Sequence, residues 1–407
     1  MIGKKDADLT RRDFLKTVGL AGLAVAGAGV TGAIAAPEPP AAPAQAATVP
    51  RRPLGKTGVE VSSLCMGGMF DTINNQLLLK QALKWGVSYW DTAESYGLSE
   101  EGYGRFFARH PEARKEIFLV TKLQPKGGKL TERLDKCLAR LKTDHVDLFF
   151  MHGLDDLDAL TPAIKAWAAE MKQAGKFKFF GFSTHANMPD NLQGAAKLGW
   201  IDAVMFTYNF QVMNTPKMQA AVDACVQAGV GLVSMKSQAG RPGKHEVGGP
   251  VKLEMVERFL KRGFTDKQAK LKAIWENPHI ASLCSQMPNL TILSANVAAA
   301  RDLTKLSREE HEALRQYALE TACDYCAGCG HICQAALGGA VPVNEVMRAL
   351  MYHRYYGEPE LARETFAGLP PDVRQRLTAV DYTQAEQACP HKLAIATLMR
   401  QATEILA

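Results

Sequence analysis

The feature that most constrains the fold is an apolar run ending in a polar residue, which recurs about every 30 residues. The first three of these polar residues are Asp91, Lys122 and His152, and Ser183 follows at a similar interval. The interval is the length of one strand and helix in a parallel sheet. Because parallel strands present their carboxyl ends on one side of such a fold, we expect these side chains to share a site there.

Apolar runs predict eight strands within residues 51–305, with helix-period segments between them. The strands are expected at 61–66, 87–92, 117–122, 146–152, 178–184, 203–208, 230–236 and 281–285. Eight such units in about 255 residues predict an α/β fold, a closed (β/α)8 TIM barrel. An open doubly wound sheet is the structural alternative, but it would usually carry a Gly-rich phosphate turn after its first strand.

The chain divides into a barrel at 47–305 and a small α-helical second domain at 306–407, where the strand signal ends. Gly240–Pro250 is a predicted loop over the barrel mouth. The composition, with 47% hydrophobic and 22% charged residues, is that of an ordinary globular protein. The net charge of +6 comes without a basic block, so no nucleic-acid partner is expected.

Residues 1–46 predict a signal peptide. Arg11 and Arg12 precede an apolar stretch rich in Gly and Ala, and a small-residue cleavage site follows at 44–46. The paired arginines resemble the twin-arginine export signal, so the export machinery is an expected partner. The protein is therefore expected in the periplasm or otherwise exported, and anchoring by an uncleaved signal is the alternative.

The strand-end residues, together with Tyr96, have the chemistry to interconvert a carbonyl and an alcohol. Tyr96 could exchange a proton with the oxygen, and Lys122 beside it would lower the pKa of the phenol. Asp91 would pair with Lys122, and His152 would orient the carbonyl oxygen. Each residue alone has a structural explanation, and only the combination at barrel spacing indicates an active site.

Residues 52–305 resemble the aldo-keto reductase family. The resemblance is carried by the sequences RPLGKTG at 52–58, DTAESYG at 91–97, TK at 121–122, MH at 151–152 and GFS at 181–183. It implies a barrel oxidoreductase acting on small carbonyl or alcohol substrates, with Asp91, Tyr96, Lys122 and His152 as catalytic residues. It also implies that NADPH lies across the mouth of the barrel.

The cofactor contacts that the resemblance implies are Ser183, Thr184, Tyr208, Lys236, Ser285 and Asn296. Three positions depart from the family pattern: Thr184 replaces an Asn, Met205 replaces a Gln and Ile292 replaces an Arg. Ile cannot bind a phosphate as a guanidinium does. The sequence therefore leaves NADP(H) and NAD(H) open, including a tightly bound nucleotide.

Five of the nine cysteines lie late in the chain. Cys323, Cys326, Cys329 and Cys333 have the C-x2-C-x2-C-x3-C spacing of bacterial ferredoxins, and Cys389 precedes Pro390. The region resembles the ferredoxin-type extension of some aldo-keto reductases. We predict a [4Fe–4S] cluster on Cys323, Cys326, Cys329 and Cys389, with Cys333 as the alternative fourth ligand. Zinc, disulfides and a relic without metal are the competing interpretations.

These features together predict an exported oxidoreductase whose iron–sulfur cluster serves electron transfer or structure. A second hypothesis is substrate oxidation with electrons passed through the cluster to a redox partner in place of soluble NADPH. A third is a non-catalytic electron carrier on a degenerate barrel.

Overall fold

The structure is a computed structural model and describes residues 47–239, 265–320, 322 and 325–407. The predicted signal peptide (1–46), the predicted loop Gly240–Pro250 and the predicted ligand Cys323 lie outside the described residues. Within the described ranges, no helix combines the length and the apolar character needed to cross a membrane.

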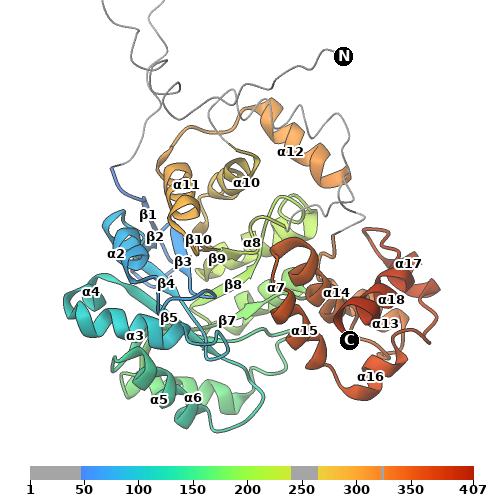
Figure 1. Cartoon of the computed structure of the whole chain (residues 1–407), viewed down its shortest axis with the longest axis horizontal. Helices are drawn as coiled ribbons and strands as arrows, with labels where there is room; N and C mark the ends of the chain where they lie inside the picture. Colours follow the sequence, from blue (N-terminus) through green and yellow to red (C-terminus); the bar gives the residue numbers. More distant parts are fainter. Residues whose placement is uncertain (1–46, 240–264, 321, 323–324) are drawn as a thin grey trace, which may run out of the picture. The chain divides into compact units, whose positions relative to one another are not determined.

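Eight parallel strands close into a barrel, which confirms the predicted (β/α)8 fold (Figure 1). The order around the barrel is β10-β3-β4-β5-β6-β7-β8-β9. The barrel strands are β3 (Leu64–Gly67), β4 (Tyr89–Asp91), β5 (Phe118–Leu123), β6 (Val146–Met151), β7 (Phe177–Thr184), β8 (Ala203–Thr207), β9 (Gly231–Met235) and β10 (Ile280–Gln286). The helices of this part are α2 (Gln76–Lys84), α3 (Ser99–Arg109), α4 (Pro111–Glu116), α5 (Leu130–Leu141), α6 (Pro162–Gln173), α7 (Met188–Leu198), α8 (Pro216–Ala228), α10 (Asp266–Trp275) and α11 (Leu290–Arg301).

An antiparallel hairpin closes the amino-terminal end of the barrel. The predicted first strand at 61–66 is in fact two strands: β2 (Glu60–Ser62) pairs with β1 (Arg51–Pro53), and β3 joins the barrel. Leu54 and Val61 of the hairpin pack into the barrel interior. The amide of Lys56 donates to the carbonyl oxygen of Gly229, just before β9. With this end closed, the described residues leave the barrel open at the carboxyl ends of its strands.

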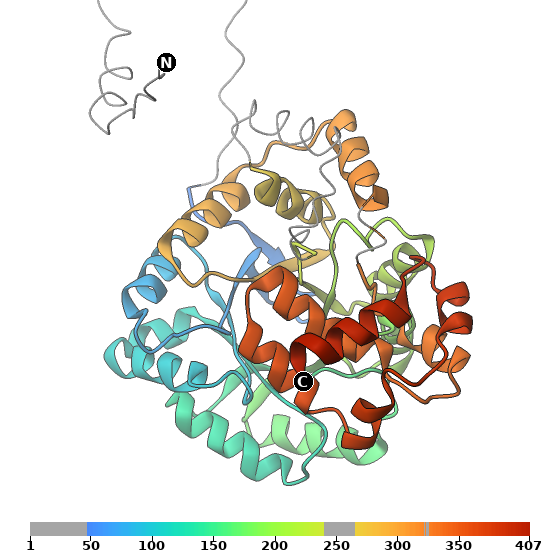
Figure 2. The same cartoon turned by 45° about the vertical axis from the view of Figure 1, so that its right-hand side comes forward.

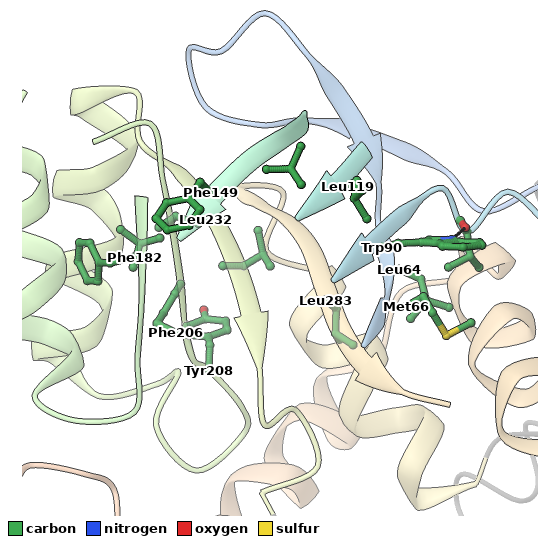
Figure 3. Close-up of a cluster of buried hydrophobic side chains, with 14 of the residues drawn as sticks. Leu64, Met66, Trp90, Leu119, Phe149, Phe182, Phe206, Tyr208, Leu232 and Leu283 are labelled. Atoms are coloured by element: carbon green, nitrogen blue, oxygen red, sulfur yellow. Dashed lines mark hydrogen bonds between the residues drawn. The ribbon is translucent and has the colours of Figure 1, made fainter. Parts of the chain in front are cut away.

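Alternation along each strand decides which side chains face the barrel interior. Tyr89, Val120 and Phe150 belong to the interior cluster. Their neighbours Trp90 and Phe149 point the other way, into the layer between strands and helices (Figure 3). The same alternation controls which residues near a strand end can reach a central site.

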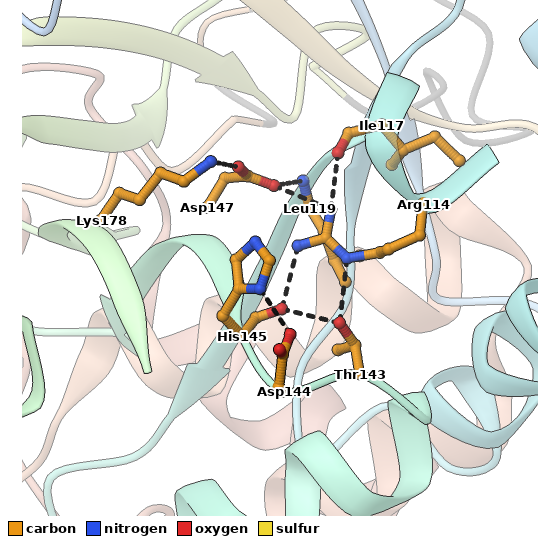
Figure 4. Close-up of polar contacts among 8 residues, drawn as sticks. All are labelled: Arg114, Ile117, Leu119, Thr143, Asp144, His145, Asp147 and Lys178. Atoms are coloured by element: carbon orange, nitrogen blue, oxygen red, sulfur yellow. Dashed lines mark hydrogen bonds and ion pairs between the residues drawn. The ribbon is translucent and has the colours of Figure 1, made fainter. Parts of the chain in front are cut away.

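A buried carboxylate ties three strands together away from the barrel mouth (Figure 4). Asp147 accepts hydrogen bonds from the amide of Leu119 at 3.0 Å, from Arg114 at 3.1 Å and from Lys178 at 2.9 Å. Burial opposes ionisation, but these three partners outweigh it and lower the pKa of Asp147. The network fixes β6 against β5 and β7.

Beyond the barrel the chain is helical. The helices are α12 (Arg308–Glu320), α13 (Gly330–Ala336), α14 (Val343–Met351), the π-helix η2 (Tyr352–Tyr356), α15 (Pro359–Ala367), α16 (Pro371–Arg376), α17 (Thr383–Ala388) and α18 (Ile395–Leu406). Residues from Val341 to Leu406 share a hydrophobic core of their own (Figure 2, red). Helix α12 packs instead in a small core with Phe210 and α10. The domain boundary at residue 306 stays a prediction. We call residues 325–407 the C-terminal helical region.

Candidate active site

Strand alternation sends three of the four predicted catalytic residues toward the barrel axis. Asp91 ends β4, two residues after the interior Tyr89, and Lys122 lies in β5. His152 directly follows β6. Tyr96 lies in the loop between β4 and α3. Because the strands are parallel, these residues meet at the same open end of the barrel.

Lys122 contacts two other members of this group, Asp91 and Tyr96. Its Nζ lies 2.7 Å from Asp91 Oδ2 and donates to the carbonyl oxygen of Thr92 at 2.9 Å. The same atom lies 3.5 Å from Tyr96 Oη and 4.7 Å from the centre of the Tyr96 ring. Burial by itself lowers the pKa of Lys122, but the interactions with Asp91, Tyr96 and Cys284 together more than compensate, so the net pKa is raised. Both burial and a raised pKa therefore characterise Lys122, and the ammonium form is favoured at neutral pH.

The pKa of Tyr96 differs from the sequence-based expectation. Lys122 does pull the phenol pKa down, as predicted, but burial raises it by more. The net pKa of Tyr96 lies above the ordinary value for tyrosine. At neutral pH Tyr96 is thus protonated and can donate a proton, which suits reduction of a carbonyl.

His152 is neutral and has an unused polar atom. Its ring meets the ring of Tyr96 edge-on, with 5.6 Å between centres. Burial, followed by the charge of Lys122, lowers the pKa of His152 well below its ordinary value. Its buried Nδ1 has no hydrogen-bond partner within the described ranges. A buried polar atom without a partner is costly, so this one favours a site that receives a ligand.

A cavity of about 1300 Å³ opens over these residues. Tyr96 and His152 line it from the barrel, while Arg348 and Tyr352 line it from the C-terminal helical region. Single small-molecule pockets usually enclose roughly 300–1,000 Å³. The cavity therefore has room for a dinucleotide together with a small substrate.

Four of the predicted cofactor-binding residues lie at or beside this cavity. Lys236, Ser285 and Asn296 line it. Asn296 Nδ2 donates to Ser285 Oγ at 3.0 Å, which ties β10 to α11. Ser183 is buried at the end of β7, where its Oγ accepts from the amide of Gly153 at 3.0 Å. Gly153 in turn borders the cavity.

The other two predicted cofactor-binding residues, Thr184 and Tyr208, do not line the cavity. Thr184 Oγ1 hydrogen-bonds within the loop that begins α7. Tyr208 packs in the outer hydrophobic layer (Figure 3), and its hydroxyl accepts from Asn277 at 3.1 Å. The reason is strand alternation: both residues are in register with the side chains of β7 and β8 that point away from the barrel axis. The cavity wall contains Met205 and Ile292, which depart from the family pattern.

His185 lines the cavity, although the sequence analysis did not single it out. It follows Ser183 by two residues and therefore shares its inward direction. Its Nδ1 lies 3.3 Å from Thr207 Oγ1. Burial, followed by the charge of Lys236, lowers the pKa of His185 well below its ordinary value. Extending the strand alternation past residue 184 would have identified it.

The described cysteines of the C-terminal run gather in one place. Helix α13 packs against α17, which brings Cys333 close to Cys389. Cys326 and Cys333 pack against the core that contains Cys389. Burial, with a smaller contribution from neighbouring thiols, raises the pKa of Cys326 to about 12 and of Cys329 to about 11.

Every cysteine within the described ranges is a free thiol, so no disulfide forms among them. In the same ranges, no three or more His, Cys, Asp or Glu side chains are arranged to hold a metal ion. Cys323, the first ligand in the predicted set, lies outside the described residues. The iron–sulfur cluster therefore stays a prediction.

The described part of the cysteine run, from Tyr325 onward, docks directly on the barrel, next to the cavity. The amide of Asn187, in the loop after β7, donates to the carbonyl oxygen of Gly328 at 2.7 Å. Asn209, after β8, donates to the hydroxyl of Tyr325 at 2.9 Å. Gly328 has a positive φ of 75°, and a Cβ there would clash with the carbonyl oxygen of His185. Glycine thus permits the close approach of the two backbones.

Known proteins with similar sequences are oxidoreductases. The uncharacterized oxidoreductase YrpG of Bacillus subtilis is 29% identical over 217 residues, covering 46% of this chain and 66% of its own length. The Schizosaccharomyces pombe aldo-keto reductase yakc, whose name specifies NADP(+), is 31% identical over 185 residues, covering 40% of this chain and 53% of its own length. The chain thus matches less than two thirds of each of these relatives.

Solved structures share the barrel. An aldo-keto reductase from Bacillus halodurans in its holo form aligns with a TM-score of 0.54 at 22% identity, covering 65% of this chain and 95% of that one. This likeness supports the fold. The sequence model of the aldo/keto reductase family matches residues 65–320, which is more than half of the chain. The chain therefore belongs to the aldo/keto reductase family.

Proposed function

We propose that the protein interconverts a carbonyl and an alcohol, with a nicotinamide dinucleotide as the hydride carrier. One observation carries the proposal: at the cavity, the Lys122 ammonium contacts both the carboxylate of Asp91 and the phenol of Tyr96. A buried phenol beside a fixed cation suits the transfer of a proton to or from a reacting oxygen.

In the direction of reduction, the four residues have distinct roles. Tyr96 Oη donates its proton to the carbonyl oxygen, and Lys122 stabilises the phenolate that remains. Asp91 holds Lys122 in place through the 2.7 Å contact. The neutral His152 ring hydrogen-bonds the same substrate oxygen and orients it. In the reverse direction Tyr96 takes the proton from the alcohol.

The cavity fits a nicotinamide dinucleotide. Its volume of about 1300 Å³ is sufficient, and Ser285 and Asn296 offer hydrogen-bonding groups on its wall. When bound, the nicotinamide supplies or accepts the hydride. Ile292, which borders the same cavity, offers no charge for a phosphate. Both NADP(H) and NAD(H), retained or exchanging, are therefore included in the proposal.

The test is the oxidation of NADPH and NADH with a panel of simple aldehydes and quinones, by the wild type and by Tyr96→Phe. The variant keeps the ring and its contact with Lys122, so it should fold normally while kcat/KM falls by about 10²-fold to 10⁴-fold. The proposal fails if the wild type neither binds nor turns over either dinucleotide. It also fails if Tyr96→Phe is as active as the wild type.

We also propose that Cys323, Cys326, Cys329 and Cys389 hold a [4Fe–4S] cluster, with Cys333 as the alternative fourth ligand. The ferredoxin spacing supports this, and so does the gathering of Cys326, Cys333 and Cys389 at one core. The cluster would be structural or would exchange electrons with a redox partner. Anaerobically purified protein should contain iron and sulfide and show a broad visible absorption band. Cys326→Ser, which removes a ligand common to both sets, should lose the iron, the sulfide and the band, whereas Cys137→Ser, in the barrel, should keep them.

Export is the third part of the proposal. The twin-arginine pattern at Arg11 and Arg12 supports recognition by the export machinery, with delivery to the periplasm or retention by an uncleaved signal. A reporter fused after residue 46 should be exported, and replacing both arginines with lysine should abolish this. Unchanged export of that variant would contradict the proposal.

A further inference from the structure

Lys236 is enclosed by two tyrosines from outside the part of the chain that matches the family. Its Nζ lies 4.4 Å from the ring centre of Tyr352 and 4.9 Å from that of Tyr356. The two rings are 6.2 Å apart and nearly perpendicular, at 70°. They stand at the two ends of the π-helix η2, beyond the matched residues 65–320. Such π-helical turns often occur at functional sites.

The backbone of Lys236 is held in an uncommon conformation. Its φ is +55°, in the left-handed region that side chains other than glycine rarely adopt. Its carbonyl oxygen accepts hydrogen bonds from Asn209 Nδ2 and from the amide of Ala239, each at 3.0 Å. A conformation of this kind persists only where the surrounding contacts enforce it. These contacts aim the Lys236 side chain at the cavity, which it lines.

Among the described residues, no opposite charge lies beside the ammonium of Lys236. Arg348 of the same cavity pairs with Glu345, and Lys122 pairs with Asp91. Lys236 makes no ion pair with any carboxylate in the described part of the chain. The two rings attract the ammonium through cation–π contacts, but they do not replace full hydrogen bonds. The N–H groups of Lys236 therefore stay available to a ligand. A partly desolvated cation in this state favours a ligand that carries an anionic group.

We propose that Lys236, held by Tyr352 and Tyr356, is an anion-binding group of the cavity. It takes a carboxylate on the carbonyl substrate, which goes beyond the cofactor contact that the family resemblance implies for this residue. The inference rests on the proposed function and adds to it the charge class of the ligand. It also gives the C-terminal helical region a role in recognition, because that region supplies the enclosing rings.

The test compares an anionic with a neutral aldehyde of similar size, succinic semialdehyde and butanal, at low ionic strength. Lys236→Met keeps the length of the side chain and its packing on the rings but removes the charge. A charge-assisted hydrogen bond contributes enough that its loss should raise the relevant KM about tenfold or more. Lys236→Arg, which keeps the charge and the ring contacts, should restore most of the affinity. Lys126→Met, at an exposed lysine bordering the cavity, is the matched control and should change little.

The pattern of effects distinguishes the two sources of the anion. A rise in KM for succinic semialdehyde alone supports the substrate carboxylate, and a rise in KM for the dinucleotide with both aldehydes overturns it in favour of a cofactor phosphate. The inference is overturned if Lys236→Met changes no KM, or if Lys126→Met changes the same KM equally. If the wild type reduces no aldehyde, the proposed function fails, and calorimetric titration with NADP⁺ and with succinate still tests Lys236. Binding that is equal in the wild type and Lys236→Met would then overturn the inference as well.

Discussion

The Lys122 ammonium contacts Tyr96 at two points, 3.5 Å from the phenol oxygen and 4.7 Å from the ring centre. The first contact favours the phenolate, and the second holds the ring whether or not the proton is present. Burial favours the protonated phenol and prevails in the absence of a ligand. Tyr96 is therefore a proton donor, and Lys122 stabilises the phenolate that forms once the proton has left.

This balance predicts opposite pH profiles for the two directions of the reaction. The pKa of Tyr96 is raised, so the protonated form dominates through the neutral range. Carbonyl reduction should be nearly independent of pH there, whereas alcohol oxidation, which needs the phenolate, should rise with pH as far as the protein stays folded. Initial rates in both directions between about pH 6 and about pH 10 measure this. A plateau in oxidation near neutral pH would contradict it.

The buried pair of Lys122 and Asp91 predicts a strong asymmetry between single and double variants. Their side chains are only 1% and 3% exposed. Lys122→Met leaves the carboxylate buried without its cation, which should cost about 3–5 kcal/mol of unfolding free energy. Adding Asp91→Asn removes the uncompensated charge and should recover much of that loss. Urea unfolding of both proteins measures the difference, and a double variant no more stable than Lys122→Met would refute the argument.

Much of this site could be predicted because it depends on two local regularities. The spacing of about 30 residues placed Asp91, Lys122 and His152 at successive strand ends, and the period of two turned them inward. Thr184 and Tyr208 were predicted from the family resemblance alone, and the same period turns both away from the cavity. His185 obeys the period and was missed because the expected strand ended at 184.

The rest could not be predicted because it depends on packing between distant segments. Tyr352 reaches the cavity only because the C-terminal helical region docks on the loops after β7 and β8. In the sequence, neither the position of Tyr352 nor its residue type indicates that it is a neighbour of Lys236. The pKa of Tyr96 is another case, since the depth of burial that raises it is a property of the assembled fold.

The carboxylate of Asp147 predicts a stability effect that depends on pH. Its folded pKa is lowered, so its contribution is complete above the unfolded pKa and is lost as pH falls through the folded value. At neutral pH, Asp147→Asn should lower the free energy of unfolding by about 2 kcal/mol, because charged hydrogen bonds to Arg114 and Lys178 are weakened. Below about pH 4, as the pH falls through the lowered folded pKa, the wild type and the variant should converge.

Urea unfolding at a series of pH values measures this convergence. Asp372→Asn is the matched control, because Asp372 pairs with Arg376 on an exposed helix face and should contribute less than about 1 kcal/mol. A constant difference between the wild type and Asp147→Asn down to acid pH would show that Asp147 acts through packing and not through its charge.

The backbone of Gly328 lies close to that of His185. We therefore predict that a methyl group added at Gly328 weakens the packing of the C-terminal helical region on the barrel. A Cβ at this position would clash with the carbonyl oxygen of His185, and the positive φ adds strain. Gly328→Ala should therefore destabilise the protein by more than about 1 kcal/mol. Because this region forms part of the cavity wall, residues 325–407 should become more sensitive to protease and substrate KM should rise.

The variant Gly338→Ala distinguishes the steric clash from the backbone strain as the cause of the destabilisation by Gly328→Ala. Gly338 also has a positive φ, of 57°, but no atom lies within 4 Å of a Cβ built there. This variant therefore carries the backbone strain without the clash and should leave the docking and the KM unchanged. Limited proteolysis and unfolding free energies of both variants measure the contrast. If both lose the same stability and neither changes protease sensitivity, the contact between Gly328 and His185 does not hold the region on the barrel.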